Sequence, residues 1–120
     1  MSRGNRLKHF TREEFNCQHT GENRMEDEFL LKLDQLRDNC GFPFVITSGY
    51  RSPNHPIEAK KDVPGTHAQG IAADIKITNA AHRYTIIREA LSMGFSGIGV
   101  AGDFIHVDTR GTVPVIWTYS

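Results

Sequence analysis

Three short stretches of the sequence place ionisable side chains among otherwise apolar, strand-like residues. They are residues 48–52 (SGYRS), 66–74 (THAQGIAAD) and 104–108 (FIHVD). A catalytic zinc ion requires three protein ligands of nitrogen or oxygen type and one open position, and imidazole and carboxylate groups supply such ligands without any cysteine. His67, Asp74 and His106 meet this requirement, so the sequence predicts a metal site formed by these three side chains.

The spacing of these residues allows them to converge. Gly70 lets the backbone turn between a histidine in a loop and a carboxylate in a strand, so that ligands seven positions apart can reach one point. A neighbouring strand then brings His106. Taken singly, Asp74 is well explained as a polar residue on a solvent-facing strand surface, and His106 as a hydrogen-bonded core histidine. Taken together, the three stretches favour a metal site.

These stretches also carry a resemblance to a known family. The HxxGxAxD pattern of residues 67–74, preceded by residues 48–52 and followed about thirty positions later by His106, resembles the zinc D-Ala-D-Ala carboxypeptidase family. That family includes vancomycin-resistance dipeptidases, phage L-alanyl-D-glutamate endolysins and, more distantly, the hedgehog signalling domain. Residues 10–17 (FTREEFNC) look like the start of the short, phage-associated peptidoglycan peptidases. The resemblance therefore covers nearly the whole chain.

The resemblance implies one zinc ion per chain, held by the three predicted ligands. It also implies that Arg51 corresponds to the arginine that orients the substrate in this family. A planar guanidinium suits that role because it can bind a carboxylate or a polarised carbonyl oxygen through two hydrogen bonds. The alternative for Arg51 is a surface arginine that pairs with Glu58 or Asp62.

The same resemblance implies a general base. Members of the family often carry Glu or Asp three positions before the last zinc histidine, which is Asp103 here. Asp103 would take a proton from the attacking water and pass it to the leaving amine. Strict strand alternation turns Asp103 away from the face of His106, unless Asp103 lies in the turn before the strand. Asp108 shares the face of His106; we expect it to orient a ligand imidazole, and it is also the second candidate for the base.

The sequence departs from its apparent relatives in two places. Some members use a histidine as base two positions before the last ligand, where this chain has Phe104, so that version of the mechanism is excluded. The Cys-x-x-Cys pair of the N-terminal loop is incomplete in residues 17–20 (CQHT), so a second, structural zinc is not expected. Cys17 and Cys40 are expected to remain reduced. Trp117 either lines the cleft or closes the core, and the core position is preferred.

Apolar spacing predicts the elements that position these residues. The predicted helices cover residues 25–39 and 80–93, and the predicted strands cover 44–47, 71–77, 97–100 and 104–109. We expect the first strand to be buried, the second to turn Asp74 away from the core, and the last two to form a hairpin. Residues 52–65 hold three prolines and should form a long surface loop. These elements indicate an α+β fold, with a small antiparallel sheet flanked by two main helices.

Composition limits the class of protein. A chain of 120 residues with 38% hydrophobic residues predicts one domain, residues 1–120. Fourteen basic and fourteen acidic side chains cancel, so no nucleic-acid partner is expected. No apolar run reaches the roughly 18 residues of a membrane span, and residues 1–10 lack the apolar segment of a secretory signal. Without a heptad pattern, a monomer is expected.

The resemblance implies zinc-dependent hydrolysis of a peptide bond in the stem peptide of bacterial peptidoglycan. It leaves open a D-Ala-D-Ala carboxypeptidase and an endopeptidase, and similarity to the short phage enzymes favours the endopeptidase. Without a signal segment, such an enzyme would reach the cell wall through a holin, a virion or a lysed cell, as suits a phage lysin. The alternative is a non-catalytic zinc-binding or cell-wall-recognition module, as the hedgehog comparison illustrates.

Overall fold

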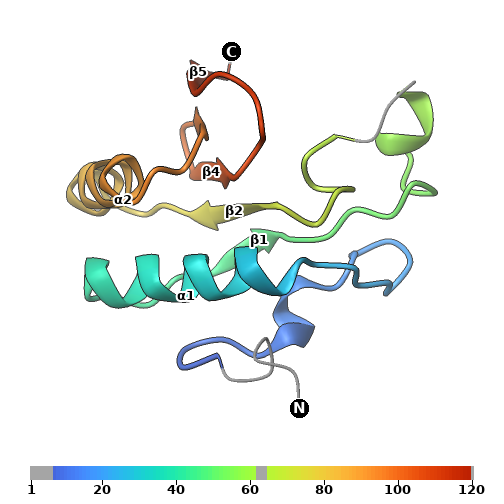
Figure 1. Cartoon of the computed structure of the whole chain (residues 1–120), viewed down its shortest axis with the longest axis horizontal. Coiled ribbons are helices and arrows are strands. Elements are labelled where there is room, and N and C mark those ends of the chain that lie inside the picture. Colours follow the sequence, from blue (N-terminus) through green and yellow to red (C-terminus); the bar gives the residue numbers. More distant parts are fainter. Residues whose placement is uncertain (1–6, 62–64, 120) are drawn as a thin grey trace.

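The computed structural model describes residues 7–61 and 65–119, which form two helices and one sheet (Figure 1). The strands are β1 (Ile46–Ser48), β2 (Ala72–Lys76), β3 (Gly97–Val100), β4 (Phe104–Asp108) and β5 (Val115–Thr118), and the helices are α1 (Asp27–Cys40) and α2 (Ala80–Ser92). The sheet order is β1-β2-β4-β3-β5, and every neighbouring pair is antiparallel except β3 and β5, which are parallel. The predicted α+β fold is confirmed.

The two helices and one face of the sheet enclose the hydrophobic core. Ile75, Ile105 and Val107 from β2 and β4 belong to the same buried cluster as Leu33 of α1 and Ile86 of α2. Because successive side chains of a strand point to opposite faces, the residues between these positions lie on the other face of the sheet. That second face of β2 and β4 carries the polar side chains of the candidate site.

Both helices begin and end close to the predicted residues. α1 ends before Gly41, whose φ of 80° is the left-handed conformation that favours glycine at this position. α2 begins after Asn79, whose side chain accepts a hydrogen bond from the backbone N–H of His82 at 2.8 Å. Among the described residues, no helix is both long enough and apolar enough to cross a membrane.

The strand predicted over 44–47 is present, shifted to Ile46–Ser48, but the expectation that it is buried is wrong. β1 begins at Ile46 and forms an edge of the sheet, and Val45 is exposed. Phe44 is buried, but it packs against the ring of Phe42 and lies outside the strand. A short β-branched run indicates extended backbone without showing which of its residues pair with a neighbour.

The sequence does not predict β5. Of its residues only Trp117 is partly buried, so the strand has no alternation of apolar and polar residues to reveal it. The predicted hairpin, by contrast, is confirmed, since β3 and β4 pair antiparallel across a short turn. The predicted loop over 52–65, of which residues 62–64 lie outside the described residues, contains a short 3-10 helix, η3 (Glu58–Lys60), and Glu58 is buried.

Gly70 occupies the turn that the sequence assigns to it. Its φ is +77°, and a Cβ at this position would collide with the backbone carbonyl oxygen of Arg24. The carbonyl of Gly70 also accepts the N–H of Glu26 at 2.9 Å, which ties the turn to the start of α1. The turn before β2 therefore requires glycine for its backbone conformation and for its close contact with the segment before α1.

We expect Gly70→Ala to destabilise the fold by more than the roughly 1–2 kcal/mol that a left-handed conformation alone costs a residue with a Cβ. The matched control is Gly94→Ala, because Gly94 has a φ of +78° with no atom within 4 Å of an added Cβ. Urea denaturation of the two variants measures both losses. Equal losses would show that the collision with Arg24 is relieved at no cost.

Candidate metal centre

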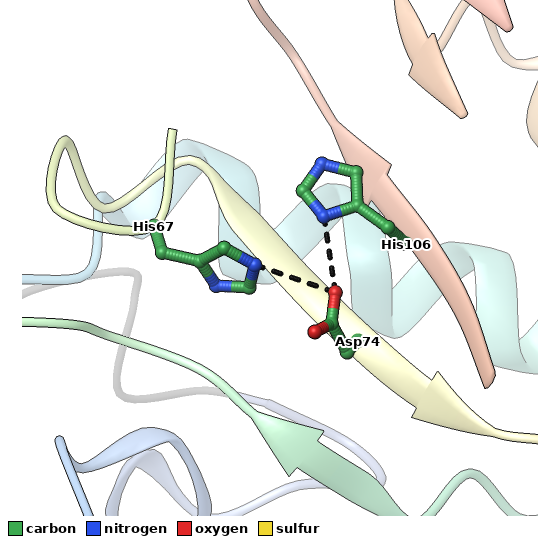
Figure 2. Close-up of side chains that lie close together, drawn as sticks. All are labelled: His67, Asp74 and His106. Atoms are coloured by element: carbon green, nitrogen blue, oxygen red, sulfur yellow. Dashed lines mark hydrogen bonds and ion pairs between the residues drawn. The ribbon is translucent and has the colours of Figure 1, made fainter. Parts of the chain in front are cut away.

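Three predicted ligands from different parts of the chain point toward one another on the open face of the sheet (Figure 2). Asp74 lies on β2 directly opposite His106 on β4, and His67 lies in the turn before β2. Asp74 Oδ1 is 3.0 Å from His106 Nδ1 and 3.3 Å from His67 Nε2. All three side chains are buried, and one potential ligand atom from each lies within 4.8 Å of the others. The structure therefore brings together the three residues that the sequence predicts to be metal ligands.

Residues 48–52 hold His67 in place from behind. His67 Nδ1 lies 2.8 Å from the backbone carbonyl oxygen of Gly49, and because a carbonyl only accepts, Nδ1 carries the hydrogen. Nε2 is then the ring nitrogen that faces Asp74. A Cβ on Gly49 would lie 2.6 Å from the backbone of Phe15, so the glycine allows this close approach. The Ser-Gly-Tyr-Arg stretch thus orients a ligand in addition to carrying Arg51.

His106 is oriented by two carboxylates, one on each side of its ring. Nδ1 faces Asp74, and Nε2 lies 2.7 Å from Asp108 Oδ2, which accepts its hydrogen. Burial disfavours the charged form and lowers the pKa of His106, but the hydrogen bonds with Asp108 and Asp74 outweigh it and raise that pKa. The Nε2–H contact fixes the tautomer in which Nδ1 is available to a metal ion.

Asp74 is a carboxylate at neutral pH. Burial alone would raise its pKa, but hydrogen bonds and charge interactions with His106 and His67 outweigh this and lower the pKa to about 2. The centre therefore offers two imidazole nitrogens and one charged oxygen. This donor set suits zinc, and a set of three protein ligands is that of catalytic zinc sites, because structural sites use four.

The side chains of His67, Asp74 and His106 line a cavity of about 380 Å³, which we call the metal cavity. Its other lining residues are Arg51, Ile57, Lys61, Thr66, Phe104, Arg110, Trp117 and Tyr119. A substrate could thus reach the centre between cationic side chains and an aromatic wall. Among the described residues, the histidine, cysteine and carboxylate groups form no other cluster suited to a metal ion.

A family model described as peptidase M15 matches residues 8–108. The matched segment contains the buried His-Asp-His group and nearly the whole sheet. The chain belongs to the peptidase M15 family. No curated protein matches the chain. M15 peptidases are zinc-dependent metallopeptidases, and in this member His67, Asp74 and His106 are the residues that could hold the ion. The prediction of a zinc peptidase family is therefore confirmed at the level of the M15 family.

Arg51 lies at the metal cavity and pairs with Glu58, one of the two partners expected for it. Its side chain lines the metal cavity, and its guanidinium also lies 3.7 Å from Glu58 Oε2. Glu58 is held in turn by Lys61 Nζ at 2.8 Å and by the backbone N–H of Gly65 at 3.0 Å. The other partner considered, Asp62, lies outside the described residues. Glu58 thus anchors Arg51 at the cavity edge. The sequence offers this pairing but not the burial of Glu58, because the high charge of the surrounding loop indicates exposure.

Asp103 lies apart from the three clustered side chains. It occupies the turn before β4, where its backbone carbonyl accepts the N–H of Ile77 at 2.8 Å. It is exposed and lines a neighbouring hollow with Thr47, Lys76 and Phe104, and not the metal cavity itself. Phe104 lines both spaces.

Asp108 lies fully buried behind His106. Burial alone would raise its pKa, but hydrogen bonds from His106 and Arg110 outweigh this and hold the pKa well below the usual range. Arg110 is absent from the predicted site, although it lines the cavity. No motif in the sequence identifies Arg110, because its hydrogen bonds to Asp108 depend on the path of the chain after β4.

Trp117 takes the less preferred of its two expected positions, since it lines the cavity and does not close the core. It is only partly buried and lines the metal cavity, with its ring 5.2 Å from that of His106. The cause is the parallel pairing of β5 with β3, which places Trp117 beside Gly99, where a Cβ would lie 2.9 Å from the indole. The predicted free thiols are confirmed, since Cys17 and Cys40 form no disulfide with each other.

Proposed function

We propose that this M15 peptidase hydrolyses a peptide bond in the stem peptide of bacterial peptidoglycan, and that it acts as an endopeptidase. The observation that carries the proposal is a buried His-Asp-His group that opens into a cavity shared with Arg51. Arg51, Lys61 and Arg110 line the same cavity. Cationic side chains beside the centre suit a small peptide that bears carboxylates, as a stem peptide does.

His67, Asp74 and His106 would hold one zinc ion per chain. When bound, zinc supplies Lewis-acid polarisation of the scissile carbonyl and lowers the pKa of a coordinated water. Arg51 binds the carbonyl oxygen or a neighbouring carboxylate of the substrate through its guanidinium, which stabilises negative charge as it develops. Glu58 keeps that guanidinium at the cavity edge, because the two charged groups lie 3.7 Å apart.

We assign the general base to Asp103. Its exposed carboxylate takes a proton from the attacking water as the new carbon–oxygen bond forms, and then delivers it to the leaving amine as the carbon–nitrogen bond breaks. Asp108 is poorly suited to this task, because it is fully buried and both of its oxygens already accept hydrogen bonds. Asp108 instead orients the ring of His106.

The second candidate function is a non-catalytic zinc-binding or cell-wall-recognition module. It is favoured by one observation, the position of Asp103 outside the cavity that the three ligands line. In either case we propose a monomer that acts at the bacterial cell wall, as a phage lysin or virion-associated protein does, with neither a nucleic acid nor a membrane as its partner.

Digestion of purified peptidoglycan tests the proposed activity. We expect the zinc-loaded protein to release a defined stem-peptide fragment, identified by mass, and we expect a chelator to reduce release to background until zinc is restored. Cleavage between L-Ala and D-Glu or within a cross-link identifies an endopeptidase, whereas release of single D-Ala identifies a carboxypeptidase. One bound zinc per chain without any released fragment would favour the recognition module.

A further inference from the structure

A continuous set of hydrogen bonds runs from the surface to the metal centre through Arg110, Asp108 and His106. Arg110 Nε donates to Asp108 Oδ1 at 3.0 Å, and the terminal nitrogen NH2 donates to Oδ2 at 2.7 Å. The backbone N–H of Arg110 adds a third hydrogen bond to Oδ1 at 3.1 Å. Asp108 Oδ2 in turn accepts from His106 Nε2 at 2.7 Å. A two-pronged arginine contact of this kind fixes both the position and the plane of a carboxylate.

The surroundings of Asp108 leave its carboxylate little freedom. Asp108 is fully buried and pairs with Gly97 on β3, where any Cβ would collide with the carboxylate. The guanidinium carbon of Arg110 lies 4.9 Å from the centre of the Trp117 ring, which also lies against His106. Arg110 is therefore held between Asp108 and an aromatic ring, and its side chain is 29% exposed.

We propose that Arg110 is a positioning residue of the metal centre, which acts through Asp108 to hold the His106 ring with Nδ1 directed at the ion. The inference rests on the proposed metal centre but on no particular substrate. Without the guanidinium, the buried Asp108 loses two of its donors and can rotate away from Nε2. The His106 ring then loses the contact that selects its tautomer. Groups that hold a metal-ligating histidine in this way typically change metal affinity by about 10–100-fold when they are removed.

The test compares zinc affinity of the full chain, by competition with a chelating dye, in the wild type and in Arg110→Gln, Arg110→Lys and Arg88→Gln. Arg88 is the matched control, because it is an exposed arginine on α2 that pairs with the neighbouring Glu89. We expect Arg110→Gln to weaken zinc binding about 10–100-fold. Arg110→Lys should recover only part of the loss, since an ammonium group keeps the charge without the two-pronged contact. Arg88→Gln should bind zinc as the wild type does.

A spectroscopic readout separates positioning from a general loss of structure. In the metal-free wild type, the nitrogen chemical shifts of His106 should report a hydrogen on Nε2, and in Arg110→Gln this signal should change while the backbone amide spectrum is retained. Adding Arg110→Gln to Asp108→Asn should cause no further loss of zinc affinity if Arg110 acts through Asp108. Wild-type affinity in folded Arg110→Gln would overturn the inference, whereas a wild-type chain that binds no zinc would overturn the proposed centre itself. If Arg110→Gln fails to fold, Arg110→Lys carries the same comparison.

Discussion

Replacing Asp74 by asparagine is expected to abolish tight zinc binding and, with it, any peptidase activity. Asp74 is the one anionic group of the three, and its Oδ1 lies between the two imidazoles. An amide oxygen carries no net charge and is a weaker ligand for zinc than a carboxylate. The loss of affinity should therefore exceed the roughly 10–100-fold effect of removing a group that only supports a ligand.

Thermal unfolding with and without zinc measures this loss directly. At a zinc concentration of about 100 times Kd, the wild type should gain about 2.7 kcal/mol of stability. For a domain of this size that corresponds to a rise in Tm of roughly 10 °C. Asp74→Asn should show almost no rise at the same zinc concentration, and the chelator should remove the rise from the wild type.

Asp38→Asn is the control for the loss of one carboxylate. Asp38 is an exposed residue of α1 that pairs with Lys8 and His9, away from the metal cavity. It should retain the full zinc-dependent rise in Tm. An equal rise in Asp74→Asn and in the wild type would show that zinc binds elsewhere, and the proposed centre would have to be abandoned.

The metal centre lends itself to prediction because two of its residues follow from simple strand geometry. Asp74 and His106 alternate with apolar residues on their own strands, so each lies on the face opposite the core. β2 and β4 pair with Asp74 directly opposite His106. The pairing of the two strands alone therefore brings these two side chains close together. His67 needs one more feature, the left-handed turn at Gly70, and glycine marks that turn in the sequence.

The residues that support the centre cannot be found in the same way. Arg110 becomes a partner of Asp108 only through the path of the chain after β4, and its side chain could equally have faced solvent. Trp117 reaches the cavity because β5 adds to β3 in parallel, a pairing that no local pattern encodes. Glu58 is buried by contacts with Lys61 and Gly65 in a loop of high charge, where an acidic residue normally indicates exposure.

The surroundings of Asp103 make its removal the decisive test of catalysis. We expect Asp103→Asn to keep zinc binding and the fold, because the side chain is exposed and lines a hollow outside the metal cavity. We expect kcat to fall by about 10²–10⁴-fold, the usual contribution of a positioned general base, since an amide cannot accept the proton of the attacking water. KM should change little, because Arg51 and the cavity that binds the substrate are left intact.

Asp108→Asn provides the contrast, because it should act through the metal centre instead. Its buried carboxylate holds the His106 ring, so the variant should lose zinc affinity, and activity should return in part at high zinc concentration. Zinc content and kcat measured on both variants therefore separate a proton carrier from a group that orients a ligand. Wild-type kcat in zinc-loaded Asp103→Asn would remove Asp103 from the mechanism. That result would be expected if the exposed carboxylate stays in the neighbouring hollow, outside the cavity that the three ligands line.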